Sequence, residues 1–129
     1  AQTFAVSDAE KFIDIEETLH WQMHMPDGMI AECRTSYSGS ANTISVETEN
    51  GWFTLDPAFY YDGLKGKTSD GKIISHAPLS QQAKQMDGIA LSIKKNTPSI
   101  VPGEMGRRDM QIIEAIYEAM RTGKKIELK

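Results

Sequence analysis

The stretch PGEMGRRDMQIIEAIYEAMRTGKKIEL, residues 102–128, decides how the rest of the chain is interpreted. Apolar side chains recur in it at spacings of three and four, and polar side chains fill the opposite stripe, which is the period of an amphipathic α-helix. Gly123 ends this helix, because glycine readily takes the left-handed conformation that follows a last helical turn. Residues 125–128 then alternate polar and apolar, which predicts a short strand. The apolar stripe comprises Met110, Ile113, Tyr117 and Met120, widened by Ile112, Ile116 and Ala119.

Antiparallel strands are predicted upstream of that helix. Residues 18–25 and 29–37 alternate apolar and polar side chains on either side of a Pro-Asp-Gly turn, which predicts a hairpin. Shorter runs follow, separated by turns such as Asn50–Gly51, and this rhythm favours a meander. These runs are residues 43–48, 52–55, 59–61, 65–68 and 72–75, and two β-prone runs, 2–6 and 11–15, precede the hairpin.

A second amphipathic helix is predicted after Pro78. Gly88 weakens it by roughly 1 kcal/mol relative to alanine, and Asn96 to Pro98 end it. Its apolar positions are Leu79, Ala83, Met86, Ala90 and Ile93.

The predicted fold class is therefore α+β, with an open, mostly antiparallel β-sheet meander and two C-terminal helices packed on one face, in a single domain spanning residues 1–129. The other sheet face is polar, and an antiparallel sheet can leave such a face open for docking. We predict an interface there, formed by His20, Gln22, His24, Glu32 and Arg34.

Composition excludes several classes of protein. The net charge of −4 gives no reason to expect nucleic acid or an anionic membrane as a partner. No apolar run approaches the ~20 residues that a membrane-spanning helix needs. The lone Cys33 excludes an internal disulfide, and together with the absence of a visible leader it favours a cytoplasmic protein, or a periplasmic one if a leader has been removed.

No catalytic, cofactor or metal site can be assembled from the residues alone. His20 and His24 lie about 13 Å apart if they share a strand, too far to bind one ion, so pairing with Glu32 or Arg34 across the hairpin is the simpler expectation. Cys33 falls on the apolar side of its strand and is expected to be an inert, buried thiol. Residues 103–108 are expected to be an ordinary helix start rather than an anion site.

The loop Asp56-Pro57-Ala58-Phe59-Tyr60-Tyr61-Asp62-Gly63 is the most distinctive segment outside the regular elements. Three aromatic side chains near a turn suit a surface for sugar stacking or domain contact. A tight loop that plugs the end of the sheet explains the same residues equally well, so both interpretations stay open. No Gly-x-Gly-x-x-Gly nucleotide fingerprint occurs in the chain.

Three stretches resemble the C-terminal domain of the Gfo/Idh/MocA oxidoreductases, the family of glucose-fructose oxidoreductase. They are ETLHWQMHMPDGMIAECRTSY at 17–37, NGWFTLDPAFYYDGLKG at 50–66 and the C-terminal stretch at 102–128, in the order that the family has them. Together they make up about half of the chain. Gly88 departs from the pattern, since relatives often have a bulky residue, frequently histidine, in that helix.

The resemblance implies a two-domain parent enzyme that moves hydride between a sugar and NAD(P) bound by an N-terminal Rossmann domain. That domain, the family's Glu-Lys-Pro tripeptide and its Asp/Tyr-x-x-x-His pair are absent here, so no catalytic residue carries over. The resemblance implies a substrate-side and oligomerisation domain that is not catalytic alone and forms a homo-oligomer through the open sheet face. Tyr60, Tyr61 and Lys65 are the expected substrate or interdomain contacts. The alternative is a free-standing binding or scaffold module with the same fold.

Overall fold

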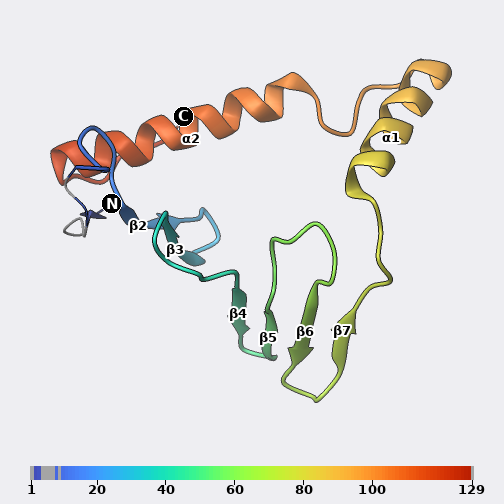
Figure 1. The fold of residues 1–129 in the computed structure, drawn as a ribbon, viewed down its shortest axis with the longest axis horizontal. Coiled ribbons are helices and arrows are strands. Elements are labelled where there is room, and N and C mark those ends of the chain that lie inside the picture. Colours follow the sequence, from blue (N-terminus) through green and yellow to red (C-terminus); the bar gives the residue numbers. More distant parts are fainter. Residues whose placement is uncertain (1, 4–7, 9, 129) are drawn as a thin grey trace. The chain divides into compact units, whose positions relative to one another are not determined.

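The structure is a computed structural model that describes residues 2–3, 8 and 10–128 (Figure 1). These residues form antiparallel strands followed by two helices, so the predicted α+β class is confirmed. The elements are β1 (Gln2–Thr3), β2 (Thr18–His24), β3 (Ile30–Ser36), β4 (Ile44–Thr48), β5 (Gly51–Leu55), β6 (Lys65–Thr68), β7 (Ile73–Ser75), α1 (Gln81–Lys95) and α2 (Gly103–Thr122). The chain divides into two compact units, one from the described parts of 1–40 and 101–129 and one from 41–100.

The first unit contains the antiparallel sheet β1-β2-β3 and helix α2. The predicted hairpin is confirmed, with Trp21 opposite Cys33 and Met23 opposite Ala31 on one face. Its turn is closed by the Met25 N–H, which donates to the Met29 carbonyl at 2.8 Å, and Gly28 there has a φ of +89°. Leu19, only 3% exposed, belongs to the small buried core.

Helix α2 faces β2 with its apolar stripe, as the sequence predicted. The part of the stripe that faces β2 is the side with Ile112 and Ile116. These two side chains are half-buried and line a groove together with Trp21 and Met23 of β2. Met110, by contrast, is 56% exposed. The helix ends where expected, because Gly123 has a φ of 66° and donates its N–H to the Ala119 carbonyl.

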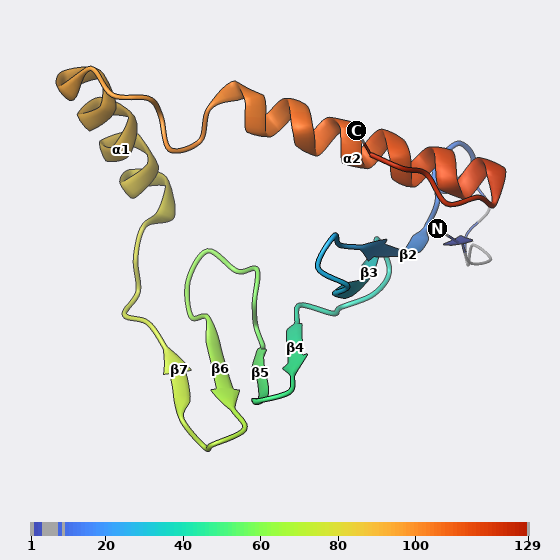
Figure 2. The ribbon, with the colours of Figure 1, turned by 180° about the vertical axis from the view of Figure 1, so that it is seen from behind.

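The second unit is the four-stranded meander β4-β5-β6-β7 followed by α1, and both views show its strands side by side in chain order (Figure 1, Figure 2). Successive side chains along each strand point to opposite faces of this sheet, and the two faces differ in exposure. Val46 and Phe53 are opposite each other and half-buried, whereas Trp52 and Ile73 on the other face are exposed.

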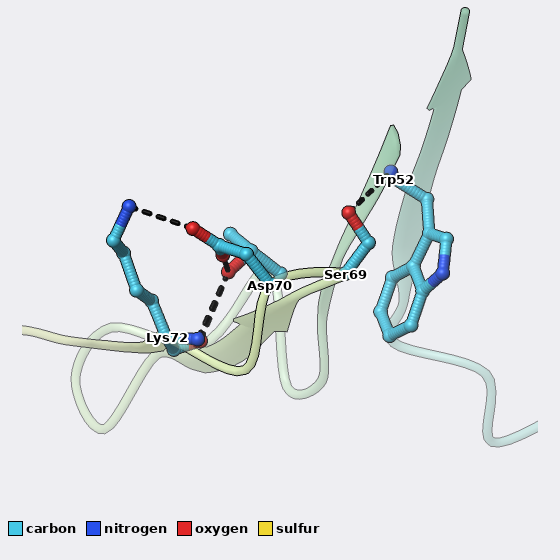
Figure 3. A network of polar contacts seen from close by, with 5 residues as sticks. Trp52, Ser69, Asp70 and Lys72 are labelled. Atoms are coloured by element: carbon cyan, nitrogen blue, oxygen red, sulfur yellow. Dashed lines mark hydrogen bonds and ion pairs between the residues drawn. The ribbon is translucent and has the colours of Figure 1, made fainter. Parts of the chain in front are cut away.

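Side chains reinforce the turn between β6 and β7. The Trp52 backbone N–H donates to Ser69 Oγ at 3.3 Å, and Lys72 Nζ forms an ion pair with Asp70 Oδ2 at 2.7 Å (Figure 3). These contacts tie the turn to β5 and hold it closed.

Two sheets are present where a single meander was predicted. Ser36 Oγ accepts the backbone N–H groups of Ser38 and Gly39 at 3.2 and 3.0 Å. This turn takes up the backbone donors that directly follow β3.

Helix α1 forms over the predicted residues but leaves its apolar stripe open. Met86 is 69% exposed and Ile93 is 76% exposed. Residues 76–80, which contain Ala77–Pro78, have no regular structure, and proline restricts the residue before it to extended conformations.

Three predicted strands are wrong, and part of a fourth lies outside the described residues. Residues 11–15 form turns and bends, because Asp8 Oδ1 accepts the N–H groups of Glu10 and Lys11. Residues 59–61 form bends, and residues 125–128 have no strand partner among the described residues. Of the run 2–6, residues 2–3 form β1 and residues 4–6 lie outside the described part. Neither helix in the described residues is long and apolar enough to cross a membrane.

Candidate functional site

Residues 56–63, in the loop between β5 and β6, present three consecutive aromatic side chains to solvent; we name this segment the aromatic loop. Phe59 is 67% exposed, Tyr60 60% and Tyr61 74%. Exposed aromatic rings in succession are unusual on a surface and are enriched where proteins bind ligands or partners. Of the two interpretations left open above, the exposure favours the binding surface, since a plug would bury these rings.

The backbone of the aromatic loop is fixed at both ends although its rings are open. At the first end, Asn42 Oδ1 accepts the N–H groups of Ala58 at 2.8 Å and Phe59 at 2.5 Å. At the second, Gln81 Nε2 donates to the carbonyls of Tyr60 at 3.2 Å and Tyr61 at 2.9 Å. Ala58 itself is buried, with 9% of its surface exposed, and anchors the start of the loop.

Lys65 begins β6, two residues after the aromatic loop ends. Its backbone carbonyl accepts the Asp56 N–H at 2.8 Å, which closes the base of the loop. Its side chain is exposed and forms no hydrogen bond or ion pair with Tyr60 or Tyr61 among the described residues. The three predicted contact residues therefore share one loop and its base, but they do not form a preassembled cluster.

The predicted interface residues occupy one face of the β2–β3 hairpin, which we name the polar hairpin face. His20 is opposite Arg34, and Gln22 is opposite Glu32, with Gln22 Nε2 donating to Glu32 Oε1 at 2.9 Å. His24 is opposite Ile30 rather than a charged side chain. The expected cross-strand arrangement thus holds for His20 and fails for His24.

Three described side chains outside the aromatic loop have shifted pKa values. Burial raises the pKa of the Cys33 thiol, which disfavours the thiolate that a nucleophile requires. The hydrogen bond from Tyr117 Oη to Glu16 raises the pKa of Tyr117, helped by burial and the Glu16 charge. At the β6–β7 turn, bonds from Lys72 and Thr68 lower the pKa of Asp70. Among the described residues, no group of three or more His, Cys, Asp or Glu side chains could hold a metal ion.

Chemically, this arrangement suits binding by shape and ring contact. The aromatic loop offers flat ring faces and two phenolic hydroxyls on a fixed backbone, which suits a ligand with one apolar face and a hydroxylated rim.

Asn42 and Gln81 are the site residues that the sequence analysis missed. Each contacts the loop from 16 to 21 positions away in the chain. Local patterns carry no signal for such long-range contacts, although asparagine and glutamine are well suited to hold exposed backbone groups.

Comparison with known proteins links the chain to a sugar enzyme. No family model matches the chain. Among solved structures it is similar to the crystal structure of an aldose-aldose oxidoreductase from Caulobacter crescentus complexed with glycerol, with a TM-score of 0.85 and 30% sequence identity. The similarity covers 95% of this chain and 39% of that enzyme, so this chain spans about two fifths of the enzyme's length.

Proposed function

We propose that the chain is the substrate-side, C-terminal domain of a Gfo/Idh/MocA oxidoreductase that moves hydride between an aldose and NAD(P). The observation that carries this proposal is the likeness to an aldose-aldose oxidoreductase along 95% of the chain at 30% identity. In this proposal the nicotinamide and the groups that transfer protons belong to a part of the enzyme outside the 129 residues. The chain contributes the surface that holds the sugar.

The aromatic loop is the proposed sugar contact. One face of a pyranose ring carries mainly C–H groups, which pack against aromatic rings, while its hydroxyls suit the phenols of Tyr60 and Tyr61. The exposed rings and the anchored loop backbone support this role. In this proposal Lys65, which begins β6 at the base of the loop, donates to a sugar hydroxyl at the rim.

The polar hairpin face is the proposed contact between two copies of the chain. Glu32 and Arg34 lie two residues apart on β3 and are both exposed. A two-fold axis between two such faces would place Glu32 of one copy near Arg34 of the other, because an isologous interface pairs a patch with itself. Complementary charge of this kind fixes register and orientation.

The test is a titration of the purified 129-residue chain, followed through the amide NMR signals. Addition of an aldose such as D-glucose should shift the signals of Tyr60, Tyr61 and Lys65, whereas NAD⁺ or NADP⁺ should cause no saturable shift. A mixture of chain, aldose and nicotinamide should show no turnover. Saturable nicotinamide binding, turnover by the chain alone, or unchanged spectra at high aldose concentration would contradict the proposal.

A further inference from the structure

We propose that Asn42 and Gln81 are positioning residues that hold the aromatic loop ready to stack on an aldose ring. This inference rests on the proposed function for its ligand. The contacts of Asn42 and Gln81 with the loop are observed in the structure. Their effect on the loop can be measured without any sugar.

Asn42 fixes the start of the loop from the segment that precedes β4. Its side-chain oxygen accepts two successive backbone N–H groups, and its own carbonyl also accepts the Ala58 N–H at 2.8 Å. The Phe59 N–H has the Asn42 side chain as its acceptor, at 2.5 Å. The exchange rate of the Phe59 amide therefore reports on the Asn42 side chain. The Ala58 amide keeps the Asn42 carbonyl as an acceptor when that side chain is removed.

Gln81 fixes the other end of the loop from the first turn of α1. Both carbonyls that accept from its amide belong to the tyrosines whose rings are proposed to contact the sugar. Ser80 caps the helix independently, since its hydroxyl accepts the Ala83 N–H at 3.3 Å. A change of Gln81 can therefore release the loop without removing the helix cap.

Anchoring of this kind bears directly on affinity. Fixing the backbone of one residue has a free-energy cost equivalent to about a fivefold to thirtyfold change in a binding constant. A loop already fixed before the sugar arrives avoids that cost, which is how preorganisation strengthens binding. The rings of Phe59, Tyr60 and Tyr61 are left open while their backbone is held, as a preformed stacking surface requires.

Hydrogen exchange tests the Asn42 anchor in the absence of ligand. In the Asn42→Ala variant the Phe59 amide should exchange about tenfold faster, because it loses its acceptor, and the Ala58 amide should change less. Asn42→Asp retains an acceptor oxygen and should restore slow exchange at Phe59 to within about twofold. Equal Phe59 exchange in wild type and Asn42→Ala would overturn the anchor.

A matched pair of variants tests Gln81. Gln81→Glu and Gln82→Glu both place a carboxylate in the first turn of α1, where no acidic residue is present, so both complement the helix dipole equally. Only Gln81→Glu removes a donor from the loop carbonyls. Its apparent Kd for D-glucose should rise about fivefold, while that of Gln82→Glu should stay within about twofold.

The outcomes separate the two levels of the inference. Weaker aldose binding in Gln81→Glu and Asn42→Ala, with recovery in Asn42→Asp, supports the positioning role. Faster exchange at Phe59 with unchanged aldose affinity overturns it, because the loop would then be loosened without consequence for binding. A wild-type chain that binds no aldose overturns the proposed function and with it the ligand assigned to the loop, while the exchange rates at Phe59 still decide whether Asn42 anchors the backbone.

Discussion

Tyr117 and Glu16 show how one pair of side chains can join distant parts of the first unit. The Tyr117 hydroxyl donates to Glu16 Oε1 at 2.8 Å, across 101 positions of sequence. This contact ties α2 to the segment that leads into β2. Burial in this unit is otherwise modest, so a single hydrogen bond contributes a visible share of its stability.

The Tyr117→Phe variant should lower the free energy of unfolding by about 1 kcal/mol or less, since the pair is partly solvated. The contact also predicts a pH dependence. Because the pKa of Tyr117 is raised in the folded chain, its contribution is fully present below the ordinary tyrosine pKa of about 10 and is lost as the pH rises through the higher folded value. Urea unfolding at neutral pH and above pH 10 measures both effects.

Tyr61→Phe is the matched control, since the Tyr61 hydroxyl has no hydrogen-bond partner among the described residues. Its free energy of unfolding at neutral pH should equal that of the wild type. A Tyr117→Phe chain that keeps the wild-type loss of stability above pH 10 would show that the phenol is not the group responsible.

Cys33 should react slowly with iodoacetamide. Burial raises the pKa of its thiol, so a smaller fraction is thiolate near neutral pH than for a free cysteine. Alkylation followed by mass spectrometry at pH 7.5 should be several-fold slower than for a cysteine-containing peptide, and it should reach the peptide rate in urea. Peptide-like reactivity in the folded chain would mean that the thiol is accessible and ionised.

At the scale of the elements, local periodicity was sufficient to predict the hairpin β2–β3 and both helices. Their patterns are long, and a one-residue slip of the hairpin would move Trp21 and Met23 to the polar face. The strands predicted at residues 11–15 and 59–61 do not form, because side chains there bind backbone N–H groups. Asp8 Oδ1 accepts the Lys11 N–H, and Asn42 Oδ1 accepts the Phe59 N–H. Period alone cannot detect such competition.

The candidate site, like the fold, was only partly predictable from the sequence. The aromatic character of Tyr60 and Tyr61 is readable from the sequence, but their exposure and their anchors depend on residues 16 to 21 positions away.

Two glycines should respond in opposite ways to substitution by alanine. At Gly66 in β6 an added Cβ would lie 2.2 Å from the Thr54 carbonyl oxygen, so Gly66→Ala should destabilise the chain by about 2 kcal/mol or more. At Gly88 in α1 the nearest atom is Ile100 Cδ1 at 3.9 Å, so Gly88→Ala should stabilise it by roughly 0.5–1 kcal/mol. Urea midpoints of the two variants give the comparison, and a destabilised Gly88→Ala chain would mean that α1 requires a close approach at this position.

At the scale of the whole molecule, the chain spans only about two fifths of the enzyme it is similar to, and its exposed surfaces are correspondingly rich in apolar and aromatic side chains. In the proposed function the exposed rings of the aromatic loop contact the sugar, which agrees with the rule that monomers rarely expose large apolar patches without a partner.

Sedimentation equilibrium should detect association through the polar hairpin face. The wild-type chain should approach the mass of a dimer at high concentration, and Arg34→Glu should shift it to the monomer, because like charges would then meet at the interface. Arg107→Glu, the same change in charge on α2, should leave the mass unchanged. A monomeric wild type, or equal effects of both variants, would argue against this face.

The most direct measurement is the transfer of magnetisation between a bound aldose and the ring protons of the chain. The proposed function predicts intermolecular nuclear Overhauser contacts from the C–H face of the pyranose to the rings of Tyr60 and Tyr61, lost when both are changed to alanine. Contacts that instead reach the groove under α2 or the polar hairpin face, or an aldose that shows no contacts at saturating concentration, would contradict it.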